Sequence, residues 1–172
     1  NDDSGTKNSV TQKSIPLLRF GSQNGMISEF YPGGDSTSST SSNAIVRTVF
    51  EGLVSYKSNG QFAPLLATSW SNPDNNTWVF KLKQSVKFHN GTAMTAQIVK
   101  DSILADTPNT ELFGIKSTVK SVDIVDAQTI KITTNNPEAL LLNKLVNIYV
   151  FDTTSKTANS PDNGTGPYIV KS

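Results

Sequence analysis

Residues 49–96 read VFEGLVSYKSNGQFAPLLATSWSNPDNNTWVFKLKQSVKFHNGTAMTA, and this stretch decides the fold. At its centre Trp78, Phe80 and Leu82 alternate with residues that form a mostly polar face, which predicts a strand with one apolar side. The turn-forming run NPDNN at 72–76 precedes this strand, so we expect a β-hairpin. The same alternation predicts that the strand continues through residues 86–88 and ends at the Asn-Gly pair that follows.

Helical patterns lie on both sides of the hairpin. Before it, apolar residues recur on one face over 45–53, which predicts a helix that Ser42 or Asn43 can cap and that Gly52 weakens. A short strand at 54–56 and a turn at 58–60 follow. After the hairpin, Thr95 is predicted to cap a second helix. Its expected buried stripe comprises Ile98, Val99, Ile103 and Leu104.

Further along the chain, strands are predicted at 119–125 and 129–133, with Ile130 and Ile132 facing inward. The tripeptide 136–138 (NPE) favours the start of a third helix, because Pro fits the first helical turn and an acid there interacts favourably with the helix dipole.

Shorter strands are expected at 15–20, at 149–151 and from Gly164 onward. The interleaved pattern predicts an α/β domain, a mixed sheet with flanking helices.

The composition excludes several classes of function. The chain has 172 residues, a formal net charge of +1 and a mean hydropathy of -0.30, so it has no strong field to attract nucleic acid or an anionic membrane. The lysines at 81, 83 and 87 fit a solvated strand face. Cysteine is absent, which rules out disulfides, thiolate metal sites and a cysteine nucleophile. No apolar run approaches the roughly 20 residues of a membrane-spanning helix.

No catalytic arrangement stands out. His89 is the single histidine, so a zinc site cannot be built on histidine and cysteine, and a Ser-His-Asp triad could form only around that residue. The G-x-S-x-G motif of serine hydrolases does not occur. We therefore predict a protein that is not an enzyme, with no metal and no cofactor, in which His89 makes a structural hydrogen bond.

Several spaced motifs occur in a characteristic order: FEGLV at 50–54, PLLATSW at 64–70, WVFKL at 78–82, VKFHNGT at 86–92 and GTGPY at 164–168. This order resembles the extracellular solute-binding proteins of family 5, the peptide- and nickel-type receptors of ABC importers. The chain departs from the family pattern at Asn90, where the family has an acid, at Lys83 and at Gln97-Ile98.

The resemblance implies a bilobed protein that clamps an oligopeptide, or sometimes a nickel chelate or sugar, and delivers it to a membrane permease. It further implies a periplasmic-binding-protein type II fold that this chain contains only in part. The implied division is a flexible leader at 1–14, the first strand and loop of the ligand-binding lobe at 15–35, an accessory α/β subdomain at 36–163 and a truncated return strand at 164–172.

A second lobe is expected beyond this chain, and a monomer is expected. The polar leader is typical of the tether that follows an acylated cysteine, so an extracytoplasmic lipoprotein is expected. In the family, ligand contacts from this region come from the loop after the first strand. By position these are Ser22, Gln23, Asn24, Tyr31, Asp35 and Ser38.

Two other hypotheses stay open at this point. One is a surface-exposed structural or interaction module of a lipoprotein with no transport role. The other is a hydrolase, which the missing catalytic cluster disfavours. Trp70, Trp78, Phe80 and Phe88 are expected in the core rather than against ligand, and Glu51 is expected to anchor a turn.

Overall fold

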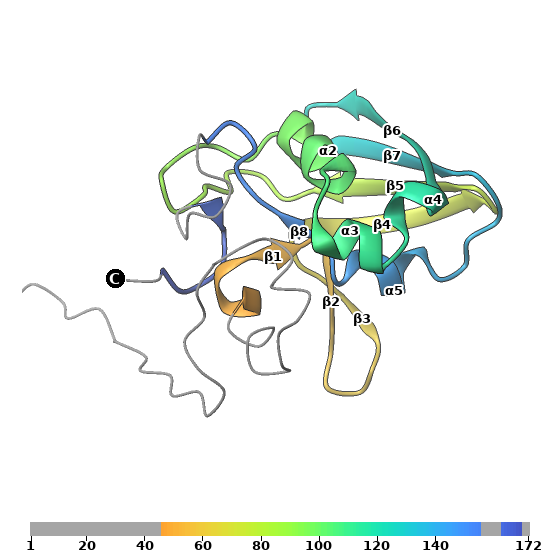
Figure 1. Cartoon of the computed structure of the whole chain (residues 1–172), viewed down its shortest axis with the longest axis horizontal. Helices are drawn as coiled ribbons and strands as arrows, with labels where there is room; N and C mark the ends of the chain where they lie inside the picture. Colours follow the sequence, from red (N-terminus) through yellow and green to blue (C-terminus); the bar gives the residue numbers. More distant parts are fainter. Residues whose placement is uncertain (1–45, 156–162, 170–172) are drawn as a thin grey trace, which may run out of the picture.

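The structure is a computed structural model, and it describes residues 46–155 and 163–169 (Figure 1). Its centre is a four-stranded antiparallel sheet in the order β4-β5-β7-β6. The strands are β4 (Ala67–Asp74), β5 (Thr77–Leu82), β6 (Val119–Asp126) and β7 (Thr129–Thr134). This sheet confirms the predicted hairpin and the predicted pair of later strands.

The sheet has one apolar face because its strands alternate as predicted. Trp78, Phe80 and Leu82 are buried on β5, and Ile130 and Ile132 are fully buried on β7. Register pairs Phe80 with Ile130 and Trp78 with Ile132, so these side chains lie directly opposite one another. They form the main hydrophobic core together with residues from the helices.

Helix α2 (Ala96–Leu104) packs on β6 and β7. The Thr95 hydroxyl accepts a hydrogen bond from the Ile98 N–H at 3.2 Å, which confirms the predicted N-cap. Ile98, Val99 and Ile103 are buried, but the prediction for Leu104 was wrong, since this side chain is 46% exposed at the end of the helix. Ser102 takes part in the buried stripe instead.

Three short helices complete the layer around the sheet: α3 (Pro108–Leu112), α4 (Ile115–Thr118) and α5 (Leu141–Leu145). The predicted start of the third helix at 136–138 was wrong by several residues. The backbone of these residues bonds to other segments instead of forming a helix. The Glu138 N–H donates to the Asn75 carbonyl at 3.3 Å, and the Thr134 hydroxyl donates to the Asn136 carbonyl at 2.7 Å.

Two short antiparallel strand pairs lie beside the sheet. β2 (Val54–Tyr56) pairs with β3 (Phe62–Pro64), forming the hairpin at the bottom of Figure 1 and confirming the predicted strand and turn. β1 (Glu51–Gly52) pairs with β8 (Tyr149–Val150), which confirms the predicted strand near 150.

The helix predicted over 45–53 was therefore wrong beyond Val49: residues 46–49 are helical, and the chain then enters β1. A Cβ on Gly52 would lie 2.8 Å from the Ile148 carbonyl oxygen, so glycine permits the close approach to the β8 side.

Two other predicted strand segments are not strands. Residues 86–88 form only an isolated bridge between Lys87 and Ala93, although Phe88 is buried. Residues 163–169 contain no strand, and 170–172 lie outside the described residues. The predicted leader, first strand and loop at 1–43 also lie outside the described residues.

The α/β class with helices beside a sheet is confirmed, and all strand pairs of the described residues are antiparallel.

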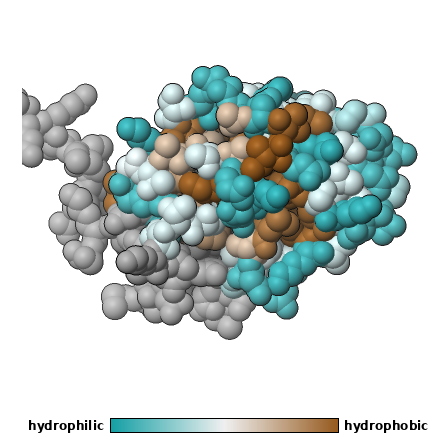
Figure 2. Space-filling view, turned by 90° about the horizontal axis from the view of Figure 1, so that it is seen from above, coloured by the Kyte–Doolittle hydropathy of each residue, from teal (hydrophilic) through white to brown (hydrophobic). Residues whose placement is uncertain are grey.

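Figure 2 shows the molecule from above, on the side where α2 and β6 lie in Figure 1. On this face apolar residues are bordered by hydrophilic ones. The larger exposed apolar side chains of the described residues are Tyr56, Leu104, Leu112, Ile124, Val125, Leu140, Tyr168 and Ile169.

Candidate functional site

The six predicted ligand contacts, Ser22, Gln23, Asn24, Tyr31, Asp35 and Ser38, all lie outside the described residues. They remain predictions. The described residues instead show how the sequence motifs converge on one place. This is the junction where residues 163–169, which we call the strap, lie against the start of β1 and the turn at 88–92.

Backbone hydrogen bonds hold the strap from two sides. On one side the Gly166 N–H donates to the Val49 carbonyl at 2.8 Å, and the Tyr168 N–H donates to the Thr48 carbonyl at 3.2 Å. On the other side the His89 N–H donates to the Gly164 carbonyl at 2.9 Å. The strap is thus fixed without belonging to a sheet.

The two strap glycines are required by space. A Cβ on Gly164 would lie 2.0 Å from the Val49 carbonyl oxygen, and one on Gly166 would lie 2.4 Å from the Thr48 carbonyl oxygen. Both contacts are with backbone atoms, which cannot rotate away. The Gly-Thr-Gly spacing therefore lets the strap lie directly on the backbone at 48–49.

Side chains from two other motifs complete the junction. The Thr165 hydroxyl donates to the Glu51 carboxylate at 2.8 Å, and His89 Nε2 lies 2.7 Å from the Gly166 carbonyl oxygen. Because a carbonyl oxygen can only accept, Nε2 carries the proton and donates. The structural role predicted for His89 is confirmed, and Glu51 anchors the strap through Thr165.

A buried carboxylate lies behind the turn at 88–92. Asp152 is 2% exposed, and it accepts from Asn90 Nδ2 at 2.8 Å and from the Thr154 N–H at 2.9 Å. Burial alone raises the pKa of Asp152, but hydrogen bonds from Thr154, Asn90 and Thr92 outweigh burial and hold that pKa below its ordinary value. No sequence pattern marked Asp152 as buried, because Asn90 comes from a segment 62 positions away.

A second, smaller hydrophobic cluster contains residues from both sides of the β1–β8 pair. It consists of Val46, Val49, Phe50, Tyr149 and Phe151. Burial raises the pKa of the Tyr149 hydroxyl, while the nearby Arg47 opposes that change. The Arg47 guanidinium also donates to the Asn147 side chain at 2.9 Å.

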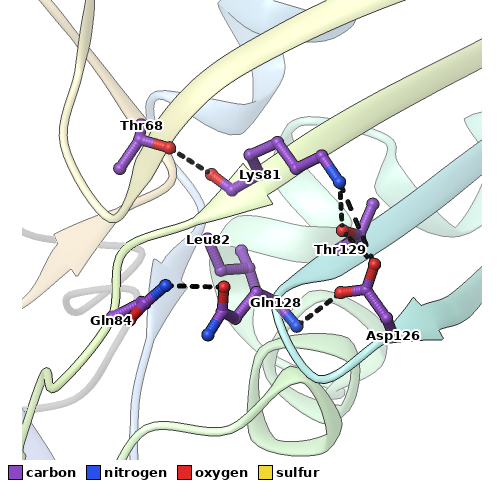
Figure 3. A pocket seen from close by; sticks show the side chains of 7 residues that line it. All are labelled: Thr68, Lys81, Leu82, Gln84, Asp126, Gln128 and Thr129. Atoms are coloured by element: carbon purple, nitrogen blue, oxygen red, sulfur yellow. Dashed lines mark hydrogen bonds and ion pairs between the residues drawn. The ribbon is translucent and has the colours of Figure 1, made fainter.

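An open hollow of about 360 Å³ lies at one end of the sheet, lined by Thr68, Lys81, Leu82, Gln84, Asp126, Gln128 and Thr129 (Figure 3). Its polar groups are bonded to one another: Lys81 Nζ lies 2.7 Å from the Thr129 hydroxyl, and Gln84 donates to Gln128 at 2.7 Å. Hydrogen bonds from the Gln128 N–H and the Thr129 hydroxyl lower the pKa of Asp126.

Within 46–155 and 163–169, no group of three or more His, Asp and Glu residues could hold a metal ion. In that part of the chain no helix is both long and apolar enough to cross a membrane.

The comparisons with known proteins agree with the motifs. A model of bacterial extracellular solute-binding proteins, family 5, middle region, matches residues 61–172. Since this match covers more than half of the chain, the chain belongs to the family of bacterial extracellular solute-binding proteins, family 5.

Individual relatives extend the match toward the N-terminus. The periplasmic murein peptide-binding protein MppA of Escherichia coli is 29% identical over 155 residues, covering 74% of this chain and 29% of MppA. The nickel-binding protein NikA of Staphylococcus aureus is 30% identical over 124 residues, covering 70% of this chain and 25% of NikA.

A solved structure supports the fold directly. The nickel ABC transporter protein of Bacillus halodurans superposes with a TM-score of 0.70 at 31% identity, covering 84% of this chain and 30% of that one. The expected partial periplasmic-binding-protein fold is therefore confirmed. The chain spans 25% to 30% of the length of these three relatives.

Proposed function

We propose that this chain is part of the substrate-binding component of an ABC importer, which captures a small solute outside the membrane and delivers it to the permease. The observation that carries the proposal is the junction. Three family motifs, around Glu51, His89 and Gly164–Tyr168, meet there in one hydrogen-bonded arrangement. Membership of the family supports the same conclusion.

The solute that we propose is an oligopeptide. The murein peptide-binding relative supports this class, whereas the nickel-binding relatives support a metal chelate as the alternative. The module with no transport role gains no support from the relatives reported above.

Further parts of the proposal concern residues for which the structure gives no description. Ser22, Gln23, Asn24, Tyr31, Asp35 and Ser38 would hydrogen-bond the peptide from the loop after the first strand. A second lobe, supplied by sequence beyond Ser172, would close over the solute. We further propose an extracytoplasmic monomer, tethered by a lipid on a cysteine ahead of Asn1.

The test is solute binding by a protein that includes the second lobe. Tripeptide to pentapeptide mixtures, glutathione and nickel-histidine would be added in turn while the melting temperature is followed. A solute at 100 times its dissociation constant stabilises the native state by about 2.7 kcal/mol, so a rise of several degrees is expected with peptides. No rise with any solute at millimolar concentration would refute the transport assignment.

The same titration on the 172-residue chain tests whether the second lobe is needed for solute binding. Because a closing lobe contributes roughly half of the contacts in a clamped site, no rise is expected for this chain alone. A robust rise would show that the site lies wholly within these residues.

A further inference from the structure

We propose that His89 is a positioning residue for solute capture, which acts by locking the direction of the strap through its Nε2–H. The locking rests on the described contacts alone. The link to capture rests on the proposed function.

His89 contacts the strap twice. Its backbone N–H donates to the Gly164 carbonyl at 2.9 Å, and its side-chain Nε2 donates to the Gly166 carbonyl at 2.7 Å. Two bonds from one residue to alternate carbonyls fix both the position and the orientation of the intervening peptide units. A single bond would leave the strap free to rotate about it.

Gly166 of the strap is also held on its opposite edge. The Gly166 N–H points to the Val49 carbonyl, while the Gly166 carbonyl points to the His89 ring. Gly166 therefore lies between two walls that come from segments 40 residues apart in sequence. Loss of the ring contact would remove one wall and so loosen the hydrogen bonds that the strap makes to the other wall.

His89 is itself held rigidly. The preceding Phe88 is 3% exposed, and its N–H donates to the Thr92 carbonyl at 2.9 Å. On the other side Asn90 donates to Asp152, whose own N–H donates to the carbonyl of Asn163, the first residue of the strap. The ring is thus presented by a turn whose two ends are anchored, so little entropy is lost when the bond forms.

If the residues after the strap enter the ligand-binding lobe, as the proposed function expects, the direction of the strap sets the angle between that lobe and the residues described here. An unlocked strap would let the loop contacts and the lobe contacts fall out of register, which weakens capture of a solute that touches both.

The test uses substitutions that separate the donor from the ring. In His89→Gln the side-chain amide nitrogen occupies nearly the position of Nε2 and still donates. In His89→Asn the amide stops one bond short, and His89→Ala has no donor. Hydrogen exchange would be followed at the amides of Gly166 and Tyr168 in the 172-residue chain, with amides of β5 as the internal reference.

Gln should keep exchange within about twofold of the wild type, whereas Asn and Ala should speed it about fivefold to tenfold, the effect of one net hydrogen bond. Exchange in β5 should not change, which excludes general unfolding. Equal exchange in all three variants and the wild type would overturn the locking role.

The same series in the protein with its second lobe tests capture. Asn and Ala should raise the dissociation constant for a bound peptide about threefold to tenfold, while Gln should leave it unchanged. Unchanged affinity across the series, despite faster exchange, would overturn the positioning role. If the wild type binds no solute, the proposed function fails together with the capture part, and the exchange series still decides whether His89 locks the strap.

Two variants of Thr165, which makes the neighbouring contact to Glu51, test whether the exchange assay detects the loss of one strap hydrogen bond. Thr165→Ser keeps the hydroxyl that donates to Glu51, and Thr165→Val removes it at similar volume. Faster exchange in the valine variant alone shows that the assay detects the loss of one strap bond. If the valine variant speeds exchange and the His89 variants do not, the proposal for His89 is refuted.

Discussion

Replacing Ser102 by alanine should destabilise the protein strongly for so small a change. The Ser102 side chain is buried on α2, and its hydroxyl makes two bonds with one residue beyond β8. It donates to the Phe151 carbonyl at 3.1 Å and accepts from the Phe151 N–H at 3.1 Å. Both Phe151 groups would lose this partner in Ser102→Ala.

The magnitude follows from these two groups. Leaving one buried backbone group unpaired costs about 1–3 kcal/mol, whereas alanine gains about 0.5 kcal/mol in helix propensity over serine. With both groups counted, the net loss in unfolding free energy should be about 1.5–5.5 kcal/mol. With a urea m-value of about 1.5 kcal/mol/M, the unfolding midpoint should fall by about 1–4 M.

Urea unfolding followed by tryptophan fluorescence measures this loss, because Trp78 is buried in the main core together with the apolar residues of α2. Ser117→Ala is the matched control: its hydroxyl donates to the Gly114 carbonyl at an exposed site, and less than about 0.5 kcal/mol is expected. If the two variants unfold within about 0.5 kcal/mol of each other, the bridge from α2 to Phe151 does not carry the stability assigned to it.

Three other predictions concern charge, space and capping. The native pKa of Asp152 is lowered, so the stability that this carboxylate contributes is full above its unfolded pKa of about 3.9 and is lost as the pH falls through the native pKa. Urea unfolding at pH 7, 5, 4 and 3 should therefore show that the unfolding free energy falls less with acid in Asp152→Asn than in the wild type. An equal fall in both proteins would contradict this. Gly164→Ala should displace the strap and speed hydrogen exchange at the Gly166 amide. Gly91 has open space around it, so Gly91→Ala should leave the strap protected and cost only the backbone strain of a φ of +89°. Equal exchange in the two variants would argue against steric packing at Gly164. Thr95→Ala should lower the unfolding free energy by about 1 kcal/mol through loss of the α2 cap, measured by thermal melting, with Thr95→Ser close to the wild type.

The local patterns predicted the central sheet well. Alternation over 77–82 and 129–134 reflects side chains that face one core, and that information lies within each strand. The Thr95 cap was equally local. The failures came where distant backbone decides the structure. Gly52 joins a strand because of β8, about 100 residues away, and the NPE tripeptide stays outside α5 because Glu138 bonds to Asn75.

The site was predicted only in part. A lone histidine beside a turn indicated a structural bond, and the structure identifies its acceptor as Gly166. Asp152 and Ser102 could not be found from the sequence, because burial and pairing of a polar residue depend on segments that meet only in the folded chain. Residue 88 illustrates the opposite error: Phe88 is buried as its pattern indicated, but not in a strand.

The strap also has a consequence for the order of folding. Thr165 bonds to Glu51 across 114 positions, and β1 meets β8 across a similar interval. Contacts this remote close a long loop among the described residues, and the entropy of that loop must be overcome before they contribute. During folding the central sheet can assemble first, while Val49 and Phe50 stay uncovered until Tyr149, Phe151 and the strap pack against them. The strap therefore docks late among the contacts of the described residues, and a chain in which it has not yet docked would expose an apolar surface to chaperones and aggregation.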